Sequence, residues 1–148
     1  ERVKILVDTL KKFNKPIIVS SQLSSNINKY PWFSGVDYMC MNQKEASANV
    51  ENFDPCDDKM QILSNTLNSN ICVTLGSEGA IFNNNKRTYY SLPYKVDSVD
   101  SCGAGDAFVA AFSIFCESNN IDLCNKWAAL STTELGTKCP PKEKFYEH

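Results

Sequence analysis

Short apolar runs alternate with amphipathic segments along the chain, and this alternation predicts its secondary structure. Apolar residues at helical spacing predict helices over 2–13, 57–67, 107–116 and 122–134, and a shorter helix is expected over 43–49. Compact apolar runs predict strands over 17–20, 36–41 and 71–75. The segments 80–82 and 88–92 flank a polar turn and predict a hairpin. Residues 21–31 are polar and indicate a loop with room for one helical turn.

Helices that alternate with short strands indicate an α/β fold. A mostly parallel sheet covered by helices on both faces gives a three-layer α/β/α arrangement, and the hairpin adds an antiparallel edge. No repeat or linker divides the chain, and 148 residues suffice for one core. The sequence opens at Glu1, already inside a helical pattern. We therefore expect a partial domain from a longer polypeptide.

Composition and charge exclude several classes of function. The net charge is -2 and the 15 Lys and Arg residues are scattered, which argues against a protein that coats nucleic acid. No apolar run is long enough to span a bilayer, and no signal peptide opens the chain. We therefore expect a cytoplasmic protein with neither a nucleic-acid nor a membrane partner.

The side chains available for chemistry are also restricted. The single histidine, His148, excludes an internal Ser-His-Asp or Cys-His mechanism and argues against a zinc site. Seven cysteines form no CxxC pair. Four of them lie in apolar patterns and are expected to be reduced core residues: Cys40, Cys72, Cys116 and Cys124.

The segment from Asp100 to Phe112 carries the clearest chemical pattern. Small residues at Gly103, Ala104 and Gly105 would let a ligand approach the backbone, and they precede an apolar helix. Unpaired amides and the helix dipole at such a start suit an anion such as phosphate. Asp106 would then act as a general base toward an attacking hydroxyl. A bare Gly-x-Gly-Asp is also compatible with Asp106 as a simple helix cap.

The longer pattern, Asp100-Ser101-x-Gly-Ala-Gly-Asp followed by Ala-Ala-Phe, resembles the C-terminal signature of the ribokinase-like (PfkB) carbohydrate kinases. Three further segments fall in the family's order. Asn42 and Glu45 match an Asn-x-x-Glu motif, although this pair could be a plain helix cap. Thr74, Gly76 and Gly79 match a motif at the end of a strand, although a plain tight turn would have the same residues. The last long helix carries Asn125 at a matching position.

The resemblance implies a mechanism and its cofactors. Asp106 would orient or deprotonate the acceptor hydroxyl, and the amides of 102–105 would stabilise the transferred phosphoryl group. Glu45 and Asn42 would organise Mg²⁺ near ATP, and Asp100 would help hold a monovalent cation, potassium in many members. Thr74 and Gly76 would line the nucleotide's phosphate and ribose side, Gly79 would belong to the same cofactor-binding motif, and Asn125 would lie beside adenine. The acceptor would be a sugar or sugar phosphate, and the full-length protein would be a homodimer.

Several alternatives remain open at this point. The sugar-binding residues and lid of such kinases lie mostly in an N-terminal half, so we expect residues 1–148 to be inactive in isolation. Ser20-Ser21-Gln22 and Leu135-Gly136-Thr137 resemble the heptose-phosphate kinase branch. A non-catalytic nucleotide-binding fragment and a nucleoside or vitamin kinase on the same fold are the other candidates. Neither GxGxxG nor GxxxxGK[ST] occurs, which argues against an unrelated nucleotide fold.

Overall fold

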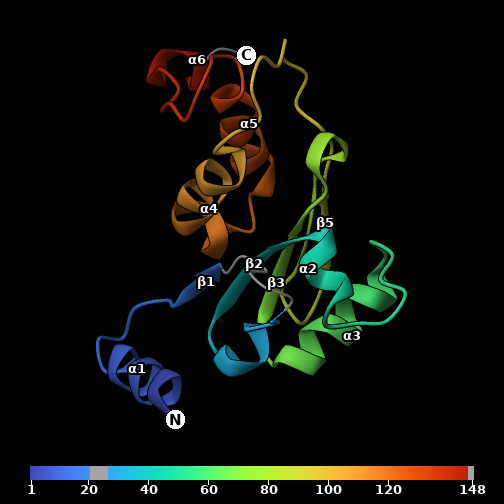
Figure 1. Ribbon diagram of the computed structural model, residues 1–148, viewed down its shortest axis with the longest axis vertical. Coiled ribbons are helices and arrows are strands. Elements are labelled where there is room, and N and C mark those ends of the chain that lie inside the picture. Colours follow the sequence, from blue (N-terminus) through green and yellow to red (C-terminus); the bar gives the residue numbers. More distant parts are fainter. Residues whose placement is uncertain (21–26, 147–148) are drawn as a thin grey trace. The chain divides into compact units, whose positions relative to one another are not determined.

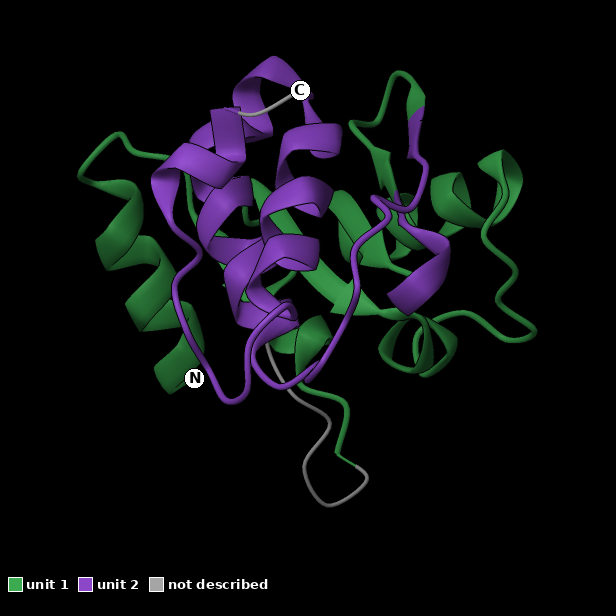
Figure 2. Cartoon of the chain, turned by 90° about the horizontal axis from the view of Figure 1, so that it is seen from above, with its two compact units in different colours: residues 1–75, 81–88 green, residues 76–80, 89–148 purple. Residues whose placement is uncertain are grey.

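The computed structural model describes residues 1–20 and 27–146, and the chain divides into two compact units (Figure 1, Figure 2). Unit 1, green in Figure 2, comprises residues 1–75 and 81–88; unit 2, purple, comprises residues 76–80 and 89–148. Ser21 and Gln22, which carry part of the heptose-phosphate kinase resemblance, lie outside the described residues.

The elements follow one another in an α/β order. Unit 1 contains α1 (Arg2–Lys11), β1 (Ile18–Ser20), η1 (Tyr30–Phe33), β2 (Tyr38–Asn42), α2 (Gln43–Ser47), α3 (Asp57–Leu67), β3 (Asn70–Thr74) and most of β4 (Ala80–Asn83). Unit 2 contains η2 (Gly76–Glu78), most of β5 (Thr88–Ser91), α4 (Ala104–Phe115), η3 (Cys116–Ser118), α5 (Ile121–Ser131) and α6 (Lys142–Tyr146).

The five strands form one sheet in the order β1-β2-β3-β4-β5. β1 runs parallel to β2 with Val19 opposite Met39, and β2 runs parallel to β3 with Met39 opposite Ile71. β4 and β5 form the hairpin, whose turn is closed by the Asn84 amide donating to the Arg87 carbonyl at 3.1 Å. The predicted mostly parallel sheet with an antiparallel edge is confirmed.

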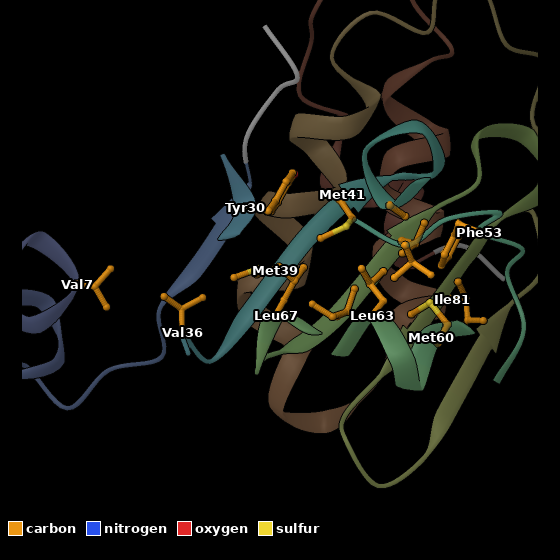
Figure 3. Close-up of a cluster of buried hydrophobic side chains, with 14 residues drawn as sticks. Val7, Tyr30, Val36, Met39, Met41, Phe53, Met60, Leu63, Leu67 and Ile81 are labelled. Carbon is orange, nitrogen blue, oxygen red and sulfur yellow. The ribbon is translucent and has the colours of Figure 1, made fainter. Parts of the chain in front are cut away.

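The core of unit 1 lies between α3 and the parallel strands (Figure 3). β2 and β3 are almost continuously apolar, and the paired residues Met39 and Ile71 are fully buried, as expected for strands of a parallel sheet. α3 contributes Met60, Leu63 and Leu67, which recur at helical spacing and are buried together. The pattern of apolar residues therefore accounts directly for this core.

In unit 2 the helices α4 and α5 pack against each other. Phe108 and Phe112 lie one turn apart on α4, with ring centroids 6.2 Å apart, and both are buried. Cys116 and Cys124 are buried too, as are Cys40 and Cys72 in unit 1. All four cysteines expected in the core are thus buried, and none of them forms a disulfide. Within the described residues no helix is long and apolar enough to cross a bilayer.

The observed element bounds correct several predictions. α1 ends at Lys11 rather than Phe13, whose ring is exposed, and α5 ends at Ser131 rather than near residue 134. Residues 30–33 at the end of the expected loop form a 3-10 helix, and α6 was not predicted. α4 begins at Ala104 instead of Ala107, because Gly103 adopts φ 82° and lets the helix start immediately after it.

Within residues 1–20 and 27–146, five asparagines adopt left-handed backbone conformations: Asn14, Asn52, Asn68, Asn85 and Asn119. Asparagine tolerates this conformation better than other side chains do, so it terminates helices and turns hairpins. Asn68 follows the last residue of α3 with φ 50°, and Asn85 lies in the turn between β4 and β5. Asn85 thus lies in the polar turn that the sequence predicts between the two hairpin strands.

Candidate functional site

The loop before α4 is fastened to the segment after α5 by one carboxylate. Asp100 accepts a hydrogen bond from the Cys102 amide on Oδ1 and from the Gly136 amide on Oδ2, both at 2.9 Å. Gly103, the residue after Cys102, has a left-handed backbone conformation. A Cβ atom added to it would lie only 2.6 Å from Cγ2 of Thr137. Glycine is therefore required at 103 by both backbone conformation and contact with the following segment.

Some backbone amides of this loop donate hydrogen bonds within the protein, and others do not. The Cys102 amide donates to Asp100, and the Ala104 amide donates to the Ser101 carbonyl at 3.2 Å. Among the described residues, the amides of Gly103, Gly105 and Asp106 donate to no acceptor. Of the loop amides that the sequence predicts for an anion site, those of Cys102 and Ala104 already have acceptors. The amides of 103, 105 and 106 are left unpaired, as is usual at the start of a helix.

Asp106 is the third residue of α4 and its side chain is exposed. The cap residue of α4 is Gly103, and no side chain caps this helix. Asp106 therefore does not act as the cap that the short motif alone would allow. An exposed carboxylate beside unpaired amides can take a proton from a hydroxyl group brought to the same place.

A pocket of about 640 Å³ lies within unit 2, directly beside this loop. Ser101 and Ala104 form its wall near the start of α4, and Gly76 contributes from the turn after β3. Ser77, next to Gly76, also lines it. From α5 and its cap residue come Asn125, Ala128, Ala129 and Thr132. The chain after β5 contributes Pro93, Tyr94, Lys95, Val96 and Ser98.

Three of the predicted ligand-contact positions line this pocket: Gly76, Ala104 and Asn125. Asn125 is buried, and its Nδ2 donates to the Leu92 carbonyl at 2.7 Å, which holds the chain after β5 against α5. Gly79 does not line it. Its φ is 103° and an added Cβ would lie 2.0 Å from the Ser91 carbonyl oxygen, so Gly79 serves the turn before β4.

Sequence reasoning missed most of the pocket lining. The α5 residues at 125, 128, 129 and 132 recur at i, i+3, i+4 and i+7, so they share one helix face. Two of them are alanines, which leave that face shallow. The signal that could have found them is a face of small residues on the same side of the helix as Asn125.

The Asn42–Glu45 pair lies in unit 1 at the start of α2. Asn42 Oδ1 accepts from the Glu45 amide at 2.9 Å, and Glu45 Oε2 accepts from the Asn42 amide at 2.8 Å, which is a reciprocal capping box. Thr74 ends β3, and its hydroxyl lies 3.5 Å from the Met41 carbonyl. Asn42 and Glu45 therefore form the helix cap that their spacing allows, and the predicted role toward metal would come in addition to it.

The magnesium expected from the sequence fits Glu45 in one respect. Mg²⁺ in phosphoryl-transfer sites keeps several waters and takes one or two carboxylates plus phosphate oxygens, so a dedicated protein cage is not needed. Within residues 1–20 and 27–146 no cluster of three or more His, Cys, Asp or Glu could hold a metal by itself. Glu45 uses one carboxylate oxygen for the capping box, which leaves the other to face a hydrated ion.

The two amides on Asp100 hold the pKa of its carboxyl below the ordinary value, with Cys102 the larger contributor and partial desolvation opposing it. Because the pKa of this carboxyl is lower in the folded than in the unfolded chain, where it is about 3.9, its charge stabilises the folded protein at pH values above about 3.9. This stabilisation is lost as the pH falls from there through the folded-state pKa. We expect Asp100→Asn to lower the thermal unfolding midpoint at pH 7, and the deficit relative to the unsubstituted chain to shrink below about pH 4.

Thermal unfolding followed by circular dichroism between pH 2 and 7 measures this deficit. Asp97→Asn is the matched control, because Asp97 is exposed and accepts no backbone amide among the described residues. A deficit of equal size at every pH would contradict the assignment of the effect to the Asp100 charge.

Comparison with known proteins identifies the family. The model of the pfkB family carbohydrate kinases matches residues 4–140. A ribokinase from Dictyostelium discoideum is 33% identical over 107 residues, 66% of this chain and 33% of that protein. A Thermotoga maritima ribokinase structure is 25% identical with a TM-score of 0.76, covering 95% of this chain and 50% of its own. A structure of Escherichia coli phosphofructokinase-2 with potassium is 23% identical with a TM-score of 0.80, and the match covers 97% of this chain and 49% of that one.

The chain thus spans about a third of that curated relative's length and about half of the two solved chains. Its α/β architecture, with the parallel strands and the hairpin edge, is the ribokinase-like fold of those structures. The family match extends from α1 to the segment after α5 and includes the loop of Asp100 and Asp106. The chain is a member of the pfkB family of carbohydrate kinases.

Proposed function

We propose that this chain forms the nucleotide-binding, base-bearing part of an ATP-dependent kinase that phosphorylates a hydroxyl group of a sugar or sugar phosphate. Kinases of this family use ATP. The observation that carries the proposal is the arrangement in unit 2. Asp106 is exposed on the first turn of α4, next to three unpaired amides, and the pocket beside that loop has room for a nucleotide base and ribose.

Each residue of the loop has a distinct part in this proposal. Asp106 takes the proton of the acceptor hydroxyl, or orients that hydroxyl toward the phosphorus atom. The amides of Gly103, Gly105 and Asp106 donate to the oxygens of the phosphoryl group as charge develops on them. Asp100 keeps the loop in place through its bonds to Cys102 and Gly136.

The pocket would take the adenosine part of the nucleotide. Ala128 and Ala129 leave an apolar surface on α5 against which a flat base can lie, and Asn125 offers an amide group beside it. Tyr94 stands at the wall, with the Lys126 ammonium 5.2 Å from its ring centroid. Magnesium, when bound, screens the charge of the nucleotide phosphates, and we propose that Glu45 and Asn42 organise its water shell. We further propose that Asp100 helps hold a monovalent cation beside the loop.

Filling the pocket tests this proposal directly. Ala129→Phe places a ring where the base would lie, and we expect the Kd for ADP in calorimetry to rise at least about tenfold, or ~1.4 kcal/mol. Ala110→Phe is the control, since Ala110 is exposed on α4 and does not line the pocket. Unchanged ADP affinity in Ala129→Phe, with the protein still folded, would reject the pocket as the nucleotide site.

The finer parts of the assignment remain predictions. The chain by itself is expected to bind nucleotide without phosphorylating sugars, because it spans about half of the solved kinases. The preference for a heptose phosphate, a homodimeric assembly and a cytoplasmic location likewise rest on the sequence. A nucleoside or vitamin acceptor is not separated from a sugar by the described residues.

A further inference from the structure

Tyr30 is buried next to Glu45 and its hydroxyl has two acceptors within reach. The side chain, on the 3-10 helix η1, is 1% exposed and is labelled in Figure 3. Its hydroxyl lies 2.8 Å from the Cys40 carbonyl oxygen and 3.2 Å from Oε2 of Glu45. A phenol has one proton to donate, so these acceptors compete for it or share it. Tyr30 precedes Glu45 by 15 residues, so no motif indicates this contact.

The contact adds to a one-sided arrangement of hydrogen bonds on Glu45. Oε2 receives the Asn42 amide at 2.8 Å as well as the Tyr30 hydroxyl. Oε1 accepts no hydrogen bond from any described residue. Glu45 is 6% exposed, and no described residue competes for Oε1. The described hydrogen bonds thereby fix one carboxylate oxygen and leave the other unused.

We propose that Tyr30 is a positioning residue for magnesium: by hydrogen bonding to Oε2 it fixes the Glu45 carboxylate with Oε1 directed at the metal's water shell. The proposal rests on the magnesium role of Glu45 in the proposed function. Without the hydroxyl, Oε2 keeps only the Asn42 amide and the carboxylate can rotate. Groups that orient the ligands of a metal in this way typically contribute about 10–100-fold to metal affinity.

Calorimetric titration of the 148-residue chain with ADP over a series of Mg²⁺ concentrations tests the proposal. Tyr30→Phe removes the hydroxyl and keeps the buried ring. We expect the Mg²⁺ concentration at half-maximal enhancement of ADP affinity to rise about tenfold. ADP affinity without Mg²⁺ should not change. Tyr38→Phe is the control, since it removes a phenol hydroxyl from the same unit, where its ring packs 6.3 Å from Phe82.

A double-mutant cycle separates the inference from the function on which it rests. In the Glu45→Gln background, Tyr30→Phe should have no further effect on the Mg²⁺ midpoint. If Glu45→Gln shifts the midpoint and Tyr30→Phe does not, the positioning role is wrong and the magnesium role stands. If Glu45→Gln leaves the midpoint unchanged, the magnesium role fails and the positioning role fails with it.

A second measurement covers the case in which Tyr30→Phe does not fold. The ¹³Cζ resonance of Tyr30 in the unsubstituted chain reports on the hydrogen bonds of its hydroxyl. We expect it to move when Mg²⁺ is added together with ADP and to stay in place with ADP alone. An unmoved resonance under both conditions would overturn the proposal.

Discussion

Replacing Asp106 by Asn is expected to slow phosphate transfer in the whole protein by about 10²–10⁴-fold, because the acceptor hydroxyl loses its general base. Nucleotide affinity should be equal or slightly higher, since a carboxylate beside unpaired amides repels phosphate. The helix start should be unaffected, because no side chain caps α4 and Asp106 makes no hydrogen bond among the described residues. Steady-state kinetics with ATP and a panel of sugars, together with ADP calorimetry, separate the two effects.

The matched control for this substitution is Asp122→Asn. Asp122 is likewise an exposed carboxylate in the first turn of a helix, α5, so the interaction with the helix dipole is similar in both positions. It should leave kcat unchanged. Equal turnover by Asp106→Asn and the unsubstituted protein would favour the alternative that the chain is a nucleotide-binding fragment without a part in catalysis.

Strongly periodic segments could be predicted from the sequence alone. α3 is observed over 57–67 as predicted, because its apolar residues recur at helical spacing and Asn68 can adopt the left-handed conformation that ends it. β2 and β3 shift by only one or two residues from the predicted bounds. In these segments burial, periodicity and the terminating residues all favour the same structure, so local and tertiary preferences agree.

The first residue of α4 and the position of the pocket could not be predicted from periodicity in the sequence. Glycine and alanine at 103–105 have no periodicity, so the helix was placed three residues too late, and the state of each amide depends on bonds to Asp100 and Ser101. The pocket depends on which small residues of α5 face the chain after β5. That is a tertiary property, and small residues on a helix are equally compatible with close packing.

The Asn42–Glu45 motif shows a different limit of sequence reasoning. Helix capping and magnesium organisation both require an acceptor side chain at 42 and a carboxylate at 45, so the pattern is the same for both. The capping box occupies Oε2 of Glu45, so the proposed contact of Oε1 with a hydrated ion would leave the cap intact. The Tyr30 contact is one that a cap does not need, and it comes from a segment with no motif of its own. Its proposed purpose is to orient the carboxylate toward magnesium.

Gly105→Ala is expected to separate stability from function in the loop. An added Cβ at 105 meets no atom within 4 Å and its φ is not in the left-handed region, so the folded chain has room for it. Alanine is favoured over glycine in a helix by roughly 1 kcal/mol, so the unfolding midpoint should stay the same or rise slightly. The methyl group would nevertheless occupy the space in front of the 103, 105 and 106 amides, where the phosphoryl group is proposed to bind.

A displacement of the phosphoryl group by about 1 Å typically costs on the order of 10²-fold in rate, and we expect kcat of the whole protein to fall by about that factor. Gly103→Ala provides the contrast, since its Cβ would lie 2.6 Å from Thr137 and its φ is 82°, so thermal unfolding should show a lower midpoint. Ser113→Thr adds a methyl group to the exposed face of the same helix and should change neither quantity. If Gly105→Ala retains full turnover, the space before these amides is not where phosphate is transferred, because an empty site tolerates a methyl group and an occupied one does not.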